Sequence, residues 1–292
     1  MSWRDKGRLM ARGLMRISPL RKVLRRLSLT GLLPPQIWKR LPVEGIFPVI
    51  LPDGRSFFYF ASANDGIARA LYWRGLRYWE SETIPVFYRL AQSAGTILDI
   101  GANTGFYTLL GCTANPGARV ISFEPVPRVY EILMEHIRLN RLEYRCEVYQ
   151  MAVSNFIGTG QMHIPVGDVP TSASLNPEGF RGFDGMLVEV LVTTIDAVIG
   201  ERPVDLAKID VEGFEPQVLE GMRCTLKRSH PSLLIECLPD GPYQQVEEIL
   251  MGLGYQIYAL TREGPLQVER VVPRRMYHEN FLFIHPEKGF QV

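Results

Sequence analysis

Apolar and polar positions follow two different periods over residues 96–292. Short apolar runs bounded by turn residues are typical of buried strands, and between these runs the apolar residues recur at helical spacing. Strands that alternate with helices indicate a doubly wound α/β sheet. The predicted strands are 96–100, 119–123, 146–153, 206–209, 232–236, 255–260 and 279–284.

The same patterns divide the chain into three regions. Residues 1–42 form a basic amphipathic helical arm, residues 43–95 a small lead-in, and residues 96–292 the main domain. Between the third and fourth predicted strands lies an insert, residues 155–194, that is rich in Gly, Pro and Ser. Loops of this length are usually functional or carry small elements of their own.

The lead-in predicts a β-hairpin followed by helices. Apolar runs at 47–51 and 56–60 flank Pro52-Asp53-Gly54, which is a turn signal. Asn64-Asp65 then opens one helical stretch, and residues 80–94 form a second. Several aromatic residues here could cover a ligand or stack on a sugar ring, although core packing is their more common role. They are Tyr72, Trp73, Tyr78 and Trp79.

The first 40 residues carry a large excess of positive charge. They hold eleven Lys/Arg against one acid, Asp5, so their net charge is +10 and the remainder of this +1 chain sums to −9. Ser18-Pro19 is a helix start, and Gly31 with Pro34-Pro35 ends that helix. One apolar helix face is predicted, made of Met10, Leu14, Ile17, Leu20, Leu24 and Leu27.

A basic amphipathic arm of this kind suits an anionic membrane surface, and we expect peripheral membrane contact through residues 1–42. An acidic partner, the acidic body of the same molecule and a transit-peptide role are the alternatives. Nucleic acid is not expected, because the arm lacks a known reading motif. No apolar stretch approaches the ~20 residues that span a bilayer, and no signal peptide is evident. We therefore expect a cytoplasmic enzyme, peripheral to the inner face of the membrane.

Cysteine and histidine spacing predicts neither a disulfide framework nor a zinc site. The four cysteines form no CxxC pair and are expected to be reduced and structural. The five histidines show neither HxxxH nor HxH spacing.

Residues 96–126 predict a nucleoside-binding unit. A short apolar strand ends in Gly101-Ala102-Asn103-Thr104-Gly105 and continues into an apolar helix at Phe106. Glycines allow a sharp turn and a close approach of backbone to a ligand. The next strand ends in Glu124-Pro125, with its acid 23 positions after Gly101. A carboxylate at that place can accept hydrogen bonds from ribose hydroxyls.

The pattern of the turn favours S-adenosylmethionine (SAM) over a dinucleotide. A dinucleotide site would show G-x-G-x-x-G, with backbone amides facing a pyrophosphate. Here the pattern is D-x-G-x-x-x-G, and the acid Asp99 lies on the strand itself. A carboxylate suits the ammonium group of SAM and would repel a pyrophosphate. A NAD-dependent oxidoreductase and a plain strand–helix turn are the alternatives.

The chain also resembles the FkbM-type family of SAM-dependent methyltransferases, over roughly residues 44–240. The resemblance lies in segments 97–107, 123–125, 152–154, 193–196 and 208–215, with Asp65 and Tyr78-Trp79-Glu80 upstream. It implies a Rossmann-like, seven-stranded, mostly parallel sheet with helices on both faces. It also implies methyl transfer to oxygen, often on sugar or polyketide hydroxyls. The arm and the detail of the insert lie outside the shared pattern.

Acidic residues follow the fourth and fifth predicted strands, where ligands of open α/β sheets bind. A hydroxyl acceptor needs a base to take its proton, and the catalytic candidates are Asp210, Glu212, Glu236 and Lys208. Lys208 could instead only pair with a neighbouring acid, and Glu215 could only cap the next helix. The acids could also hold a divalent cation such as Mg²⁺, although no metal ligand is assigned.

The adenine edge is expected to bind at the end of the third predicted strand, at Ala152-Val153. The leading function is O-methylation of a small-molecule or glycan hydroxyl. N-methylation of an amide or amine and a non-catalytic SAM-binding scaffold are the alternatives.

Overall fold

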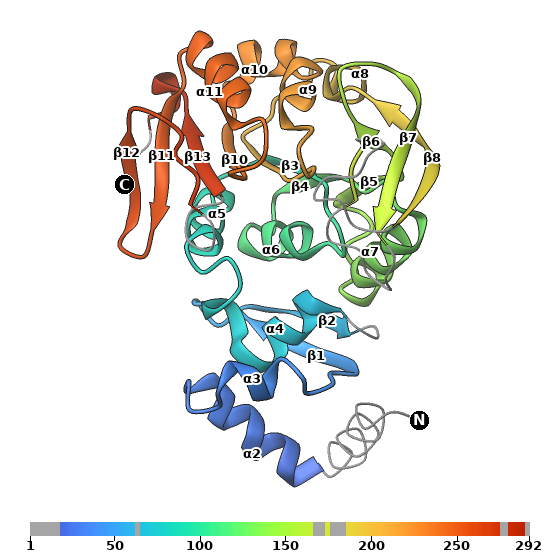
Figure 1. The fold of residues 1–292 in the computed structure, drawn as a ribbon, viewed down its shortest axis with the longest axis vertical. Helices are drawn as coiled ribbons and strands as arrows, with labels where there is room; N and C mark the ends of the chain where they lie inside the picture. Colours follow the sequence, from blue (N-terminus) through green and yellow to red (C-terminus); the bar gives the residue numbers. More distant parts are fainter. Residues whose placement is uncertain (1–17, 62–64, 166–172, 176–184, 275–279, 290–292) are drawn as a thin grey trace. The chain divides into compact units, whose positions relative to one another are not determined.

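The computed structural model describes residues 18–61, 65–165, 173–175, 185–274 and 280–289 (Figure 1). These residues form two compact units, one ending at Ser81 and the other starting at Glu82. None of the described helices is both long and apolar enough to cross a membrane.

The first unit is a β-hairpin packed against short helices. The predicted hairpin is confirmed, with an antiparallel pair that turns at Gly54, whose φ is +87°. Asp65 caps the following helix, because its side chain accepts a hydrogen bond from the Ala68 amide at 2.8 Å. The elements are α2 (Ser18–Leu29), α3 (Pro35–Trp38), β1 (Gly45–Ile50), β2 (Ser56–Ala61), α4 (Gly66–Arg74) and η1 (Gly75–Arg77).

Helix α2 contacts the rest of its unit through arginine side chains as well as through its apolar residues. Arg21 Nε donates to the Tyr72 hydroxyl at 2.7 Å, and Arg25 Nε donates to the Tyr72 carbonyl at 3.2 Å. Both guanidinium groups also lie over the Tyr72 ring. Leu20 and Leu27 of the predicted apolar face are exposed, and Met10, Leu14 and Ile17 lie outside the described residues.

The second unit is built on an eight-stranded sheet with the order β12-β11-β13-β10-β9-β3-β4-β5. Strands β5, β4, β3, β9 and β10 are parallel neighbours, and β13 lies antiparallel between β10 and β11. The strands are β3 (Thr96–Ile100), β4 (Arg119–Phe123), β5 (Cys146–Tyr149), β9 (Leu206–Ile209), β10 (Ser232–Glu236), β11 (Gln256–Thr261), β12 (Gly264–Val268) and β13 (Asn280–Ile284).

The predicted α/β class and mostly parallel sheet are confirmed, with two differences in strand detail. The sheet gains β12, a short edge strand that contains Pro265 and exposes Leu266 and Gln267. Its apolar signal is weak because an edge strand with solvent on both sides needs few apolar residues. The single strand expected over 146–153 is instead divided, and its second part, β6 (Ala152–Val153), belongs to another sheet.

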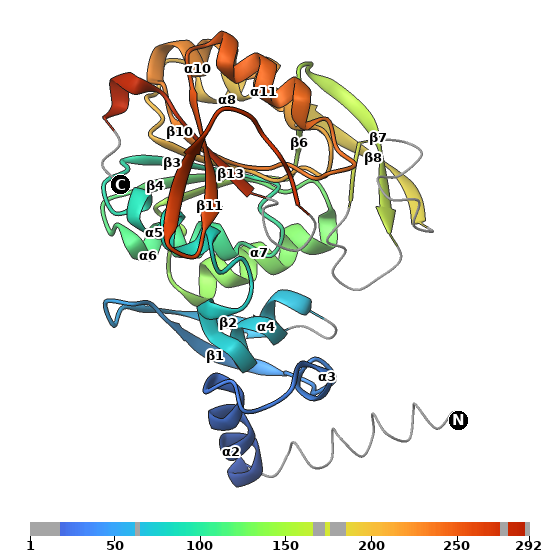
Figure 2. The same ribbon diagram turned by 60° about the vertical axis from the view of Figure 1, so that its left-hand side comes forward.

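Helices cover both faces of the large sheet, as Figures 1 and 2 show. Helices α5, α6 and α7 lie on one face, and α8, α9, α10 and α11 lie on the other. A large apolar cluster packs in the core between them, and the central strand β9 is buried at all of its positions, including Lys208. The helices are α5 (Thr83–Ala91), α6 (Phe106–Ala114), α7 (Pro127–Leu139), α8 (Ile195–Ile199), α9 (Glu215–Glu220), α10 (Arg223–Ser229), α11 (Tyr243–Gly252) and η2 (Pro286–Lys288).

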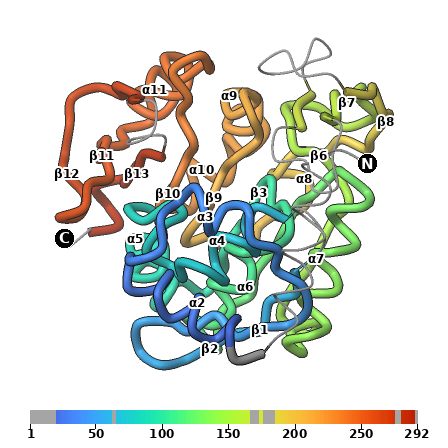
Figure 3. Tube along the Cα trace, turned by 60° about the horizontal axis from the view of Figure 1, so that its bottom comes forward, coloured from blue at the N-terminus to red at the C-terminus, as the bar shows by residue number. Residues whose placement is uncertain are grey.

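The insert carries its own small sheet, with the order β6-β8-β7. Strands β7 (Gly158–Pro165) and β8 (Gly185–Thr193) pair antiparallel, and β6 runs parallel to β8. A second apolar cluster, which includes Val129 and Val192, packs beneath it. Figures 1 and 3 place this small sheet and the β11–β13 group at opposite ends of the unit.

Candidate active site

The parallel strands bring most of the predicted site residues to one edge of the sheet. Strands β4, β3, β9 and β10 are consecutive neighbours, so the residues after their carboxyl ends follow one another along that edge. These are the Gly101–Gly105 turn, Glu124, Asp210 and Glu236. We call this the carboxyl edge.

The glycine turn after β3 is shaped by contacts with the chain itself. The amides of Gly101 and Ala102 both donate to the Phe123 carbonyl, at 3.0 and 2.9 Å. Gly101 has a φ of +80°, and a Cβ there would overlap the backbone carbonyl of Asp210. Gly105 has a φ of +88°, and a Cβ there would overlap Leu133. Gly101 is therefore required by packing against backbone, and Gly105 is favoured by its left-handed backbone, whatever ligand binds beside them.

Glu124 is buried and holds the turn after β3 next to the start of α7. Its two oxygens accept hydrogen bonds from the amides of Asn103, at 2.9 Å, and Val126, at 2.8 Å. Burial raises the pKa of Glu124 to about 7, although these two amides act to lower it. A carboxylate has about four acceptor positions, so capacity for a ribose diol remains. The residues at this place therefore fit the expected nucleoside.

Asp99 is buried in strand β3 and is hydrogen-bonded to a residue of helix α6. It is only 1% exposed, and its Oδ2 accepts from the Thr108 hydroxyl at 2.6 Å. The Thr108 hydroxyl also lies 2.7 Å from the Ser122 hydroxyl. Burial raises the pKa of Asp99 to about 6, opposed by Thr108 and by the charge of Lys208. The ammonium contact expected for Asp99 stays a prediction, and Thr108 and Ser122 were not found from the sequence.

Lys208 is a buried cation within the central strand. Its Nζ lies 2.9 Å from Asp210 Oδ2 and 5.4 Å from the centre of the Tyr107 ring. Lys208 is 1% exposed, whereas the Asp210 side chain is 28% exposed. The pairing with a neighbouring acid that the sequence allowed is therefore present, and Asp210 lies at its solvent side.

Three carboxylates meet beside this ion pair. One oxygen from each of Asp210, Glu212 and Glu236 lies within 4.8 Å of the others. The pKa of Glu236 is raised well above its usual range, first by burial and then by the charges of Asp210 and Glu212, while Lys208 opposes the shift. Burial and the neighbouring carboxylates therefore favour the protonated form of Glu236.

Glu212 is held in an unusual backbone conformation by its neighbours. Its φ is +53° and that of Gly213 is +97°. Glu215 Oε1 accepts from the amides of Val211, at 3.2 Å, and Gly213, at 3.1 Å. On the other side, the Ser174 hydroxyl donates to the Glu212 carbonyl at 2.9 Å. Left-handed backbone at a residue with a side chain persists only where the surroundings hold it, and such residues cluster at functional sites.

Glu215 does more than start a helix. It is the first residue of α9 and only 3% exposed, and its hydrogen bonds go to the loop before the helix. Burial raises its pKa to about 7. From the sequence, Glu215 was an acid after the fourth strand that could only cap the next helix, because a hydrogen bond to the preceding loop has no signal in residue spacing.

The remaining candidates pack in the core of the second unit. Ala152 and Val153 are buried in β6 beside β8, and Phe106 is buried at the start of α6. No described contact links Ala152 or Val153 to Glu124, so the adenine assignment stays a prediction. In the first unit Tyr72 and Trp73 are buried, as core packing predicts.

The second unit matches known proteins along most of its length. The model of the family described as the Methyltransferase FkbM domain matches residues 99–258. Methyltransferase sdnD of Sordaria araneosa is 28% identical over 61% of this chain and 81% of its own length. The 31-O-demethyl-FK506 methyltransferase FkbM of Streptomyces tacrolimicus is 28% identical over 61% of this chain and 80% of its own.

Among solved structures, methyltransferase FkbM from Methylobacillus flagellatus aligns over 66% of this chain and 44% of that chain, at 18% identity and a TM-score of 0.44. The O-methyltransferase TomG of Streptomyces achromogenes, solved with SAM, aligns over 70% and 81%, at 14% identity and a TM-score of 0.42.

Proposed function

Because this chain belongs to the FkbM family of SAM-dependent methyltransferases, we propose that it methylates a hydroxyl oxygen of a small molecule or glycan. The observation that carries the proposal is the carboxylate cluster Asp210, Glu212 and Glu236, which lies on the same edge as Glu124. A hydroxyl is a weak nucleophile until its proton leaves, whereas an amine in its neutral form is already nucleophilic. A cluster of carboxylates beside the nucleoside pocket therefore favours an oxygen acceptor.

The residues that would hold the cofactor are the turn Gly101–Gly105, Asp99 and Glu124, with Ala152-Val153 at the adenine edge. SAM supplies an activated methyl group on a sulfonium, so the protein mainly positions the acceptor and removes its proton. Glu124 would accept hydrogen bonds from both ribose hydroxyls, as its buried and still incompletely used carboxylate allows.

Within the cluster we propose that Glu212 is the base that removes the proton of the acceptor hydroxyl. Asp210 is paired with Lys208, and the raised pKa of Glu236 favours its protonated form. Glu212 lies on the loop that Glu215 and Ser174 hold from two sides, so its carboxylate has a fixed place. The Lys208 ammonium offsets part of the negative charge of the cluster.

The test is a Glu212→Gln substitution with SAM binding and turnover measured separately. Loss of a general base typically costs about 10²-fold or more in turnover, while the affinity for SAM should be unchanged. Glu201→Gln is a matched control, because that side chain is 93% exposed. Turnover of Glu212→Gln near that of the unaltered chain would remove Glu212 from the catalytic set.

Product analysis decides between the oxygen and nitrogen acceptors. Incubation with SAM labelled in its methyl group and a panel of hydroxylated and amine acceptors should give methyl ethers. Label found only on nitrogen would favour the N-methylation alternative, and SAM binding with no product on any acceptor would favour the scaffold.

A divalent cation in the carboxylate cluster is the second arrangement that these residues allow. We propose that the Lys208 ammonium, rather than a metal ion, supplies the positive charge that the carboxylate cluster needs. Turnover should therefore survive chelation of metal ions by EDTA. If EDTA abolishes turnover and added Mg²⁺ restores it, a metal ion and not Lys208 supplies this positive charge.

We also propose that the enzyme works at the inner face of a membrane through residues 1–42. In the described part of this arm, Lys22 and Arg26 lie exposed beside exposed Val23 and Leu27 on α2. Cations beside apolar side chains suit an anionic bilayer. The protein should float with anionic vesicles at low salt, and no enrichment at low or physiological salt would contradict the proposal.

A further inference from the structure

A group of two histidines and a glutamate lies at the edge of the large sheet opposite the carboxylate cluster. His230 precedes β10, and His285 follows β13. Because β13 runs antiparallel to β10, the start of β10 and the end of β13 lie side by side. We call this the amino edge, since it is where the parallel strands begin. The fold thus joins two histidines that are 55 positions apart in the sequence.

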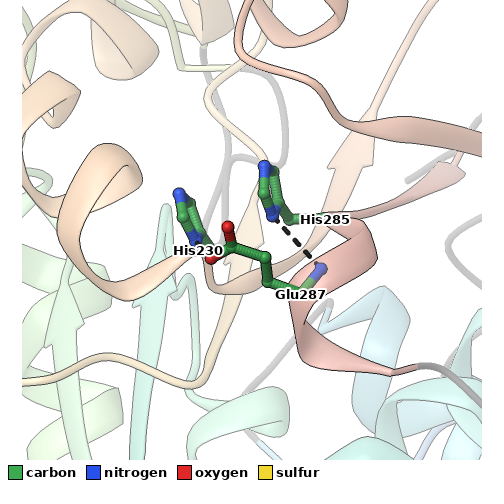
Figure 4. A group of neighbouring side chains, drawn as sticks. All are labelled: His230, His285 and Glu287. Atoms are coloured by element: carbon green, nitrogen blue, oxygen red, sulfur yellow. Dashed lines mark hydrogen bonds and ion pairs between the residues drawn. The ribbon is translucent and has the colours of Figure 1, made fainter.

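The three side chains are close enough to share one ion. One ligand atom from each of His230, His285 and Glu287 lies within 4.8 Å of the others. The imidazole rings are stacked, with centres 3.7 Å apart and planes 12° from parallel. Figure 4 shows the Glu287 carboxylate turned toward His230, whose Nδ1 lies 2.9 Å from it. Ligands about 2.1 Å from a tetrahedral Zn²⁺ lie about 3.4 Å apart, so the three ligand atoms lie within about 1.4 Å of that spacing. The two rings would turn out of their stacked arrangement to point their nitrogens at one ion.

The backbone around both histidines fixes where their rings lie. His230 ends helix α10 in the left-handed conformation, and its amide donates to the Leu226 carbonyl at 3.1 Å. His285 begins η2, and its Nδ1 accepts from the Glu287 amide at 3.4 Å (Figure 4). The Tyr255 ring packs edge-on against His285 at 5.4 Å.

Space beside the other ring nitrogen of His285 is kept open by a glycine. A Cβ at Gly254 would lie 3.2 Å from His285 Nε2 and 3.6 Å from its Cδ2. The charge of the neighbouring Lys288 is taken up by Asp205, whose Oδ1 lies 3.2 Å from its Nζ. A metal ion bound to the histidines would therefore not be blocked by a side chain at position 254. Nor would an unpaired Lys288 ammonium repel it.

We propose that His230, His285 and Glu287 bind one divalent transition-metal ion, with Zn²⁺ as the expected species. Two imidazole nitrogens and one carboxylate oxygen are ligands that Zn²⁺ prefers. Two protonated rings stacked this closely would repel each other, whereas one shared metal ion binds both rings in their neutral form. The ion would tie η2, which follows the last strand, to the turn that begins β10. This metal site is independent of the methyl transfer that we propose for the opposite edge.

The test is calorimetric titration of the tag-free full chain with ZnCl₂, with Co²⁺ absorption as a second readout of the ligand set. We expect one ion per chain. His230→Ala and His285→Ala should each weaken binding at least about tenfold, and Glu287→Gln should weaken it less, because its carboxylate is largely exposed. Glu269→Gln alters an exposed carboxylate elsewhere and should bind as the unaltered chain does.

Two controls keep the result decisive. Cys224 is an exposed thiol in α10 that could bind Zn²⁺ itself, so Cys224→Ser should leave the affinity unchanged. Melting temperatures in EDTA show whether each histidine variant folds, and Glu287→Gln decides the case if one does not. Zn²⁺ binding that persists in the His230→Ala/His285→Ala double variant, or that Cys224→Ser abolishes, overturns the proposal.

Discussion

The two edges of the large sheet differ in how they hold their polar groups. At the carboxyl edge, the pKa values of Glu215 and Glu236 are raised, first by burial, and Glu215 and Lys208 are both buried. At the amino edge, His230 and Glu287 remain partly or largely exposed and lie at ordinary helix ends. Burial of ionisable groups is costly unless they are paired or hydrogen-bonded, and groups with strongly shifted pKa values are concentrated at active sites. The contrast favours chemistry at the carboxyl edge and ion binding at the amino edge.

The largest effect is expected at Gly101, because the segments that follow β3 and β9 approach each other closely at this point of the carboxyl edge. In Gly101→Ala the new Cβ would overlap the Asp210 carbonyl, and the left-handed φ of +80° would add strain. We expect a loss of roughly 3 kcal/mol or more in the free energy of unfolding. Chemical denaturation measures it. Gly252→Ala, where a Cβ would have nothing within 4 Å, is the control and should change stability little. Equal stability of the two variants would contradict the packing described.

The next prediction concerns how pH controls cofactor affinity. Hydrogen bonds from ribose hydroxyls favour the ionised form of Glu124, whose pKa burial raises to about 7. The affinity for SAM should therefore rise about tenfold per pH unit below that pKa and level off above it. In Glu124→Gln the affinity should be weaker, and the dependence above pH 6 should be lost, leaving only the dependence that Asp99, with its pKa of about 6, contributes at lower pH. Binding by the unaltered chain that does not vary between pH 5 and 8 would contradict the role of Glu124.

The same carboxyls also predict how stability varies with pH in the absence of cofactor. Glu124 and Glu215 have folded pKa values near 7, raised from about 4.5. The folded state therefore binds more protons than the unfolded chain between these pH values, so these groups lower stability as the pH rises through that window. Denaturation curves of Glu124→Gln and Glu215→Gln should each show a shallower decline from pH 5 to 7 than the unaltered chain.

A smaller effect is expected where a residue acts through the position of another. Glu215→Ala removes the acceptor of the Val211 and Gly213 amides, which costs about 1–3 kcal/mol, and frees the loop that carries Glu212. Turnover should fall while SAM affinity holds. Glu215→Gln keeps one carbonyl oxygen and should restore most of the turnover. If both variants lose turnover equally, hydrogen bonding to the loop is not what matters.

The smallest effect is expected from the amino edge. His230→Ala removes a partner of His285 and Glu287 at the edge opposite Glu124, so SAM affinity and turnover should stay within about twofold of the unaltered chain. Parallel assays of both quantities measure this. A loss of turnover comparable to that of Glu215→Ala would show that the two edges are coupled.

The sequence predicted the elements with continuous apolar signals and missed the contacts between distant segments. Six of the seven expected strands are present as single strands of the large sheet, because apolar runs such as 232–236 are bounded by turns, and the strand expected over 146–153 is divided between two sheets. Strand β12 was missed because an edge strand carries few apolar residues. Asp210 and Glu236 were found because each lies at or just beyond the end of a parallel strand.

Other parts of the site have no signal in residue spacing. Thr108 and Ser174 are single hydroxyl residues whose partners, Asp99 and Glu212, lie on other elements. The pairing of His230 with His285 depends on an antiparallel strand that returns to the same edge, so it leaves no HxxxH or HxH spacing in the sequence. The glycines of the turn were predicted to make room for a ligand, which stays a prediction, and the structure adds a packing reason for Gly101, where a Cβ would overlap the Asp210 carbonyl.

Calorimetric titration with SAM, with its demethylated product and with NAD tests the central claim most directly. A pocket in which Glu124 receives a ribose diol should bind both sulfur compounds, at least about tenfold more weakly in Glu124→Gln, and should show no comparable affinity for NAD. No measurable heat with either sulfur compound, or binding that Glu124→Gln leaves unchanged, would contradict this account.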